Sequence, residues 1–178
     1  MGLISRLFWP DMRFKNIYEI TPQLLSECGI NAVISDIDNT LVTYDDPSPT
    51  TEARCWLASM KEAGIKIAFI SNNTGERVEK FCEGMDCYFR AESGKPSRKY
   101  LLEALTHMGV DKANAALLGD QLFTDVLAGK LAGIRTILVD PIKDVMTPLF
   151  RFKRALEKPI LSAYERHISK NRQKDKDK

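Results

Sequence analysis

Between residues 31 and 141, short apolar runs typical of buried strands alternate with longer stretches of helical periodicity. Such alternation predicts parallel strands in one sheet, with the connecting helices on both faces. Strands are predicted over 32–38, 65–71, 87–91, 115–119 and 135–140, and apolar stripes predict helices over 51–63 and 98–108. We therefore expect a single Rossmann-like three-layer α/β/α domain with a mainly parallel sheet.

The composition is that of one ordinary globular domain. The chain has 178 residues, enough for one full core, and lacks the 18 or more consecutive apolar residues of a membrane span. Arg6, Pro10 and Asp11 interrupt the apolar start, so no signal peptide is evident and a cytoplasmic location is expected. Three segments are expected: an N-terminal amphipathic or docking segment (1–30), a core (31–148), and a basic C-terminal helix with a disordered tail (149–178).

Two carboxylates stand two residues apart where the first predicted strand ends, in Ser35-Asp36-Ile37-Asp38-Asn39-Thr40-Leu41. Side chains with this spacing point to the same side of a strand, where like charges repel unless a cation separates them. Magnesium fits such a place, because it prefers oxygen ligands and leaves room for waters and a substrate phosphate. The alternative is a polar turn that only caps the strand.

Three further polar segments follow predicted strands or precede predicted helices. Ser71-Asn72-Asn73-Thr74-Gly75 opens a helix, where a hydroxyl and backbone N–H groups can bind an anion, although such residues are also common in ordinary turns. Lys95 precedes another helix and is either a point charge for phosphate or a solvated side chain. Asp120 and Asp125 follow a buried strand, where helix-capping acids are the alternative. Since ligands bind beyond the carboxyl ends of parallel strands, we expect one shared crevice.

The order of these segments is more specific than any one of them. D-x-D-N-T-L, I-S-N-N, G-K-P and G-D-Q-x-x-T-D resemble, in this order over residues 31–140, the haloacid dehalogenase (HAD) superfamily of aspartate-nucleophile phosphatases. With F-W-P-D and I-Y-E-I-T-P near the N-terminus, the chain is similar to the YqeG-like group, which is related to the phosphatidylglycerophosphate phosphatases. The resemblance implies a capless HAD fold and a phosphoric monoester hydrolase with a Mg²⁺ cofactor.

The resemblance also implies catalytic and metal-binding roles. Asp36 would attack phosphorus and form an aspartyl-phosphate. Asp38 would protonate the leaving oxygen and then activate water. The carboxylates of Asp36 and Asp120, with the backbone carbonyl of Asp38, would hold magnesium.

Other residues would hold the substrate or support the site. Ser71, the Asn72 backbone and Lys95 would bind the transferring phosphate oxygens, with Lys95 counted among the catalytic residues. Asp125 would orient Lys95 or a metal-bound water. Thr40 would shape the loop that aims Asp38, although it could equally be an ordinary turn residue.

The segments after Asp38 and Ser71 are too short for a cap domain, which favours an open site and a large or surface-bound phosphorylated substrate. A lipid head group is the leading candidate: phosphatidylglycerophosphate, giving phosphatidylglycerol in phospholipid biosynthesis. A nucleic-acid end, a protein or a soluble sugar phosphate are alternatives. A non-catalytic nucleic-acid-binding adaptor is the alternative of another class, and the presence of every acid and lysine of the motif argues against it.

Both ends of the chain bear on location. Leu3, Ile4, Leu7 and Phe8 share one face of a short predicted helix, which would lie in a membrane interface or dock on the sheet. From residue 151 onward ten Lys or Arg stand against four Asp or Glu, whereas the rest has sixteen against twenty. This tail is either solvated or attracted to anionic lipid. A peripheral position on the inner face of the membrane is therefore the alternative to a purely cytoplasmic one.

Overall fold

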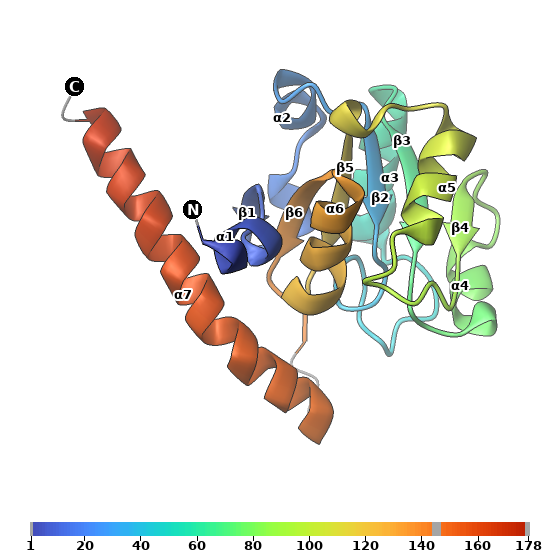
Figure 1. The fold of residues 1–178 in the computed structure, drawn as a ribbon. Helices are drawn as coiled ribbons and strands as arrows, with labels where there is room; N and C mark the ends of the chain where they lie inside the picture. Colours follow the sequence, from blue (N-terminus) through green and yellow to red (C-terminus); the bar gives the residue numbers. More distant parts are fainter. Residues whose placement is uncertain (1, 144–146, 177–178) are drawn as a thin grey trace.

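The computed structural model describes residues 2–143 and 147–176, and its centre is a six-stranded parallel sheet in the order β1-β6-β5-β2-β3-β4 (Figure 1). The strands are β1 Met12–Phe14, β2 Ala32–Ser35, β3 Lys66–Ile70, β4 Tyr88–Arg90, β5 Ala115–Gly119 and β6 Arg135–Val139. The α-helices are α1 Leu3–Phe8, α2 Pro22–Glu27, α3 Thr51–Glu62, α4 Gly75–Cys82, α5 Lys99–Met108, α6 Leu127–Ala132 and α7 Pro148–Lys176. Shorter helical turns are η1 Ile17–Glu19, η2 Lys112–Asn114 and the π-helical η3 Leu122–Val126.

The alternation of strands and helices predicted this α/β fold correctly, and the structure adds one strand to it. β2 is shorter than predicted, because the chain leaves the sheet after Ser35 and turns into the loop that carries the two aspartates. β1 was not predicted and extends the sheet at one edge by pairing in parallel with β6, Phe14 lying opposite Val139. Part of the N-terminal docking segment is thus a strand of the central sheet.

Helices cover both faces of the sheet because successive strand residues point to opposite faces. Val33 packs with Trp56 of α3 and Phe81 of α4 in the core of one face. Ile34 packs with Leu101 of α5 in the core of the other face, which α6 also covers. The two cores join the sheet to a helical layer on each face, and this three-layer packing holds the strand ends in place.

The N-terminal helix α1 is partly docked. The Phe8 ring lies edge-on to Phe123, with ring centroids 5.3 Å apart. Leu3 and Ile4, in contrast, are 73% and 60% exposed. Of the two interpretations of this segment, docking therefore describes the end of α1, while its first turn leaves apolar side chains in solvent.

The C-terminal helix α7 runs past α1 along the outside of the domain (Figure 1). Ile160 and Leu161 pack against Leu122 and Val126 of η3. The helix continues to Lys176 and so includes most of the tail expected to be disordered; no Gly or Pro follows Pro159 to break it. Residues 177 and 178 lie outside the described part. None of the described helices has the length and apolar character needed to cross a membrane.

Candidate active site

The candidate site lies where the strand order reverses. β2 is followed along the chain by β3 on one side, whereas β5 pairs with β2 on the other side. In open α/β sheets such a reversal leaves a crevice beyond the carboxyl ends of the strands. Asp36 follows β2 and Asp120 follows β5, and the backbone N–H of Asp36 donates to the Leu118 carbonyl at 2.8 Å. The sheet register therefore brings the two aspartates together.

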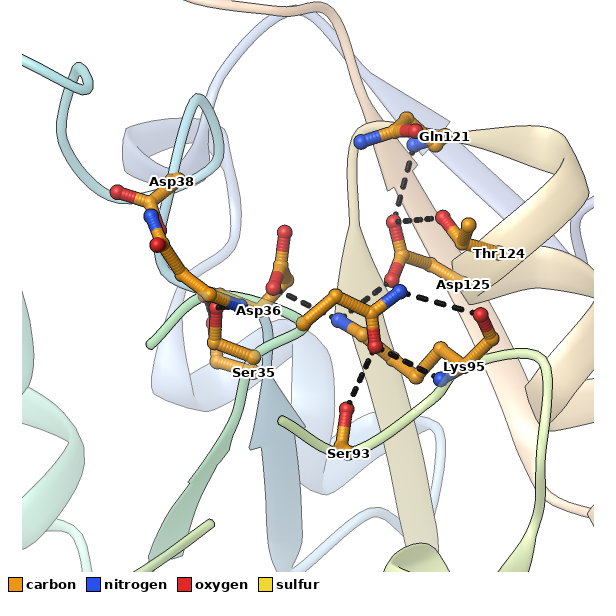
Figure 2. Close-up of polar contacts among 11 residues, drawn as sticks. Ser35, Asp36, Asp38, Ser93, Lys95, Gln121, Thr124 and Asp125 are labelled. Atoms are coloured by element: carbon orange, nitrogen blue, oxygen red, sulfur yellow. Dashed lines mark hydrogen bonds and ion pairs between the residues drawn. The ribbon is translucent and has the colours of Figure 1, made fainter. Parts of the chain in front are cut away.

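Lys95 links two of the aspartates. Its Nζ lies 2.7 Å from Asp36 Oδ1 and 2.8 Å from Asp125 Oδ1. Figure 2 draws both ion pairs as dashed lines. The lysine side chain is only 2% exposed, so this charge is held away from water. Burial alone would lower its pKa, but the carboxylates of Asp125 and Asp36 outweigh burial and raise the pKa of Lys95 above its ordinary value. Lys95 is therefore a fixed positive charge beside Asp36.

The Asn72 side chain holds the backbone that carries Lys95. Asn72 Oδ1 accepts from the Lys95 N–H at 2.7 Å and from Ser93 Oγ at 2.8 Å, and Asn72 Nδ2 donates to the Lys95 carbonyl at 3.1 Å. Nearby, Ser71 Oγ accepts from the Asn73 N–H at 3.0 Å. The expected contribution of Asn72 was its backbone, and the structure adds this clamp by its side chain.

The Asp38 carboxylate is turned away from the contacts between Lys95 and the other aspartates (Figure 2). Arg77 Nη2 lies 2.9 Å from Asp38 Oδ1, and Asn73 Nδ2 donates to Asp38 Oδ2 at 3.0 Å. Asp38 is 3% exposed. Two polar partners thus hold its carboxyl group at the wall of the site.

Three carboxylates form a cluster that could hold a metal ion. Asp36, Asp120 and Asp125 each offer an oxygen, and these atoms lie within 4.8 Å of one another. Asp120 Oδ1 is buried and has no hydrogen-bond partner among the described residues. A buried carboxylate oxygen without a partner is costly, and a hard cation would satisfy it. Asp125 is thus the third carboxylate of the cluster. The Asp38 side chain is not part of it, and the expected ligand from Asp38 was its backbone carbonyl.

The cluster changes the proton affinity of its members. Burial raises the pKa of Asp36 to about 8, although the Lys95 ammonium opposes the shift. Burial likewise raises the pKa of Asp120 to about 7 against the opposing charge of Arg154. A cation bound between these carboxylates would favour their ionised forms and release the protons.

Asp125 reaches the cluster across Gly119. A Cβ atom at position 119 would lie 2.3 Å from Asp125 Cγ, a distance that no side chain could tolerate. Asp125 Oδ2 accepts from the Gln121 N–H at 3.1 Å, which keeps its other oxygen on Lys95. The glycine in the Gly-Asp-Gln segment is therefore required for the close approach of this carboxylate.

The loop after Asp38 is tied to the end of the core. Asn39 adopts φ 65°, and its side chain exchanges two 2.8 Å hydrogen bonds with the Lys143 backbone. Thr40 is 2% exposed, and its hydroxyl has no partner within the described part of the chain. Thr40 does not line the cavity, so its expected role in shaping this loop stays a prediction.

A cavity of about 260 Å³ opens over these groups. It is lined by Asp36, Asp38, Tyr44, Ser71, Asn72, Asn73, Lys95, Gln121, Thr124, Phe150 and Lys153. Five predicted residues therefore share its wall: Asp36, Asp38, Ser71, Asn72 and Lys95. Within residues 2–143 and 147–176 no cap covers it: β2 and α3 are joined by residues 36–50 alone, and between β3 and Lys95 lie α4 and β4.

Helix α7 contributes residues that were expected only to form part of a basic segment. Arg154 forms an ion pair with the Asp120 carboxylate, and its Nη1 donates to the Asp120 carbonyl at 2.7 Å. The same nitrogen donates to Glu157 Oε2 at 2.8 Å, and Glu157 Oε1 accepts from the Leu122 N–H at 2.8 Å. The three-residue spacing of Arg154 and Glu157 within α7 was a sequence signal for the contact between them. Nothing in the local sequence indicated the contact of Arg154 with Asp120.

Comparison with known proteins identifies relatives that match most of the chain. Residues 92–141 match the HAD-hydrolase-like family model. The chain is 40% identical to the Probable phosphatase YqeG of Bacillus subtilis (strain 168) over 92% of this chain and 95% of that protein. It is 25% identical to the chloroplastic/mitochondrial phosphatidylglycerophosphate phosphatase 1 of Arabidopsis thaliana over 88% of this chain, but only 48% of that longer protein.

Solved structures share the fold. A crystal structure of an uncharacterized protein from Listeria monocytogenes serotype 4b superimposes with a TM-score of 0.52 at 21% identity. The alignment covers 67% of this chain and 85% of that one. At this identity the likeness extends to the fold alone.

Proposed function

Since the chain belongs to the HAD-like phosphatases, we propose that it is a magnesium-dependent phosphomonoesterase that works through an aspartyl-phosphate on Asp36. One observation carries the proposal: a buried carboxylate, 2.7 Å from a buried lysine, lies in the wall of an open cavity beside two further acids. A nucleophile, a fixed positive charge and metal ligands are what phosphoryl transfer requires.

The reaction divides into two displacements at phosphorus. An Asp36 carboxylate oxygen attacks phosphorus, the bond to the substrate oxygen breaks, and Asp38 protonates that leaving oxygen. Asp38 then removes a proton from water, and the water oxygen displaces Asp36 to release inorganic phosphate. For the first step the Asp38 carboxyl group rotates from its contact with Arg77 towards the leaving oxygen. Asp38 lines the cavity, so this rotation points its carboxyl group at the substrate.

Fixed groups around the phosphate lower the barrier. The Lys95 ammonium, the Ser71 hydroxyl and the Asn72 backbone N–H are donors for the phosphate oxygens. The carboxylates of Asp36 and Asp120 and the backbone carbonyl of Asp38 would hold Mg²⁺, which supplies charge neutralisation at the transferring oxygens when bound. Asp125 keeps Lys95 in place through its 2.8 Å contact.

We propose phosphatidylglycerophosphate as the substrate. The name of the Arabidopsis relative supports it, although that relative is matched over only 48% of its length. The open cavity also supports it, because a lipid head group presented by a membrane can reach such a site without a lid. Exposed Leu3 and Ile4 on α1, with the basic α7, would hold the enzyme on an anionic surface.

A phosphoester panel tests the proposal. Wild-type protein should release phosphate from phosphatidylglycerophosphate in mixed micelles faster than from sugar phosphates or nucleic-acid ends. EDTA should stop phosphate release, and added Mg²⁺ should restore it. Asp36→Asn should reduce release to background while the protein stays folded. Full activity in EDTA, or release above a few per cent with Asp36→Asn, would refute the mechanism; preference for another ester would replace the substrate.

A further inference from the structure

One wall of the cavity comes from helix α7 and contains an unneutralised positive charge. Lys153 lines the cavity, and its Nζ has no hydrogen bond or ion pair with any residue in the described part of the chain. Its neighbour is the Phe150 ring, whose centroid lies 5.8 Å from Nζ. By contrast, the other nearby cations, Lys95, Arg77 and Arg154, are each paired with an aspartate of the site.

The position of this lysine is fixed by the residues that follow it. Arg154 binds Asp120, and Glu157 accepts from the Leu122 backbone, so the first turns of α7 are anchored to the loop after β5. Glu157 is 2% exposed, so this anchor is buried. Lys153 is therefore presented to the cavity by a fixed helix rather than by a freely moving tail.

An aromatic surface adjoins Lys153 in the cavity wall. The rings of Tyr44 and Phe150 meet edge-to-face with centroids 6.1 Å apart, and both residues line the cavity. Tyr44 comes from the loop after Asp38 and is 40% exposed. The wall thus offers apolar surface for a short carbon spacer beside a cation for a negative group.

From this arrangement we propose that α7 selects the substrate, with Lys153 binding a second anionic group on the leaving alcohol of the phosphomonoester. The inference rests on the proposed function, in which Asp36, Ser71 and Lys95 engage the phosphate that is removed. The preferred substrates are then short-chain alcohols that carry a phosphomonoester at one end and a phosphodiester or phosphate at the other. A lipid head group and its soluble deacylated form share this chemistry.

The test compares Lys153→Gln with Lys158→Gln, a matched loss of an exposed lysine on the same helix. Each variant is assayed with 4-nitrophenyl phosphate, which lacks a second anion, and with deacylated phosphatidylglycerophosphate, which has one. We expect Lys153→Gln to lower the kcat/KM for deacylated phosphatidylglycerophosphate, relative to that for 4-nitrophenyl phosphate, about tenfold. The loss should appear mainly as a higher KM for the deacylated substrate, because one charge-assisted hydrogen bond is lost. Lys158→Gln should keep the wild-type ratio, and Lys153→Arg should restore most of it.

Intact lipid in neutral detergent micelles distinguishes the head group from the membrane surface. Equal losses with the deacylated and intact forms support binding of the head-group phosphodiester. A loss confined to intact lipid means that Lys153 meets the assembled surface, and it overturns the proposal. An unchanged ratio in a folded Lys153→Gln also overturns it. If the wild type hydrolyses none of these esters, the proposed function itself fails.

Discussion

Raising the pH from 5 to 7 should destabilise the metal-free protein, and much of this effect should come from Asp36. Its pKa is about 8 in the folded protein, against an ordinary value of 3.8. The folded state therefore binds the proton more tightly than the unfolded chain does. The resulting stabilisation is fully present below about pH 4 and is lost as the pH rises through about 8.

The size of the effect follows from one proton. While the folded protein holds the Asp36 proton and the unfolded chain does not, the free energy of unfolding falls by about 1.4 kcal/mol per pH unit. Between pH 5 and pH 7 this amounts to about 3 kcal/mol, and Asp120, with a pKa of about 7, adds to it in the same direction. The urea midpoint should drop by on the order of 1 M.

Urea unfolding in EDTA, followed by the fluorescence of the buried Trp56, measures this slope. Asp36→Asn cannot titrate, so its stability should fall less steeply with pH than the wild type's. Asp86→Asn removes an exposed carboxylate and should keep the wild-type slope. Added Mg²⁺ should stabilise the wild type more at pH 7 than at pH 5, because protons compete for the ligands. Equal slopes in wild type and Asp36→Asn would show that Asp36 is already ionised.

Three shorter predictions concern other parts of the molecule. Gly119→Ala places a Cβ 2.3 Å from Asp125 Cγ, so we expect a loss of about 1–3 kcal/mol in urea unfolding and reduced phosphate release; wild-type values for both would contradict the close approach. Asp38→Asn should slow hydrolysis of esters with poor leaving groups more than that of 4-nitrophenyl phosphate, and equal losses would argue against its acid role. Replacing exposed Leu3 and Ile4 together with Asp should reduce sedimentation with phosphatidylglycerol vesicles at unchanged melting temperature; unchanged sedimentation would exclude α1 as an anchor.

The positions of Asp36, Ser71 and Asp120 could be predicted because each directly follows a strongly apolar strand. In a parallel sheet the carboxyl ends of neighbouring strands lie at one edge. Local sequence was therefore enough to predict that these residues lie close together. β1 carried no comparable signal. It has three half-buried residues without alternation, and only its pairing with β6 makes it a strand.

The partners of the acids could not be found in this way. Arg77 and Arg154 lie 39 and 34 positions from the aspartates that they contact. On a helix, an arginine that enters a site has the same local sequence context as one that faces water. The contribution of α7 to the cavity wall depends on how the helix packs, which its composition does not determine.

The pairing of β1 with β6 has a consequence for how the chain folds during synthesis. The Asp11 carboxylate accepts from the Thr136 N–H at 2.8 Å, a contact between residues 125 positions apart. β1 leaves the ribosome well before β6, so it has no partner strand until nearly the entire core has followed. Contacts of such long range are slow to form, because the loop between them loses entropy when it closes. Until then Met12 and Phe14, the apolar residues of β1 that pack half-buried against the core, remain in water and available to chaperones or to other nascent chains.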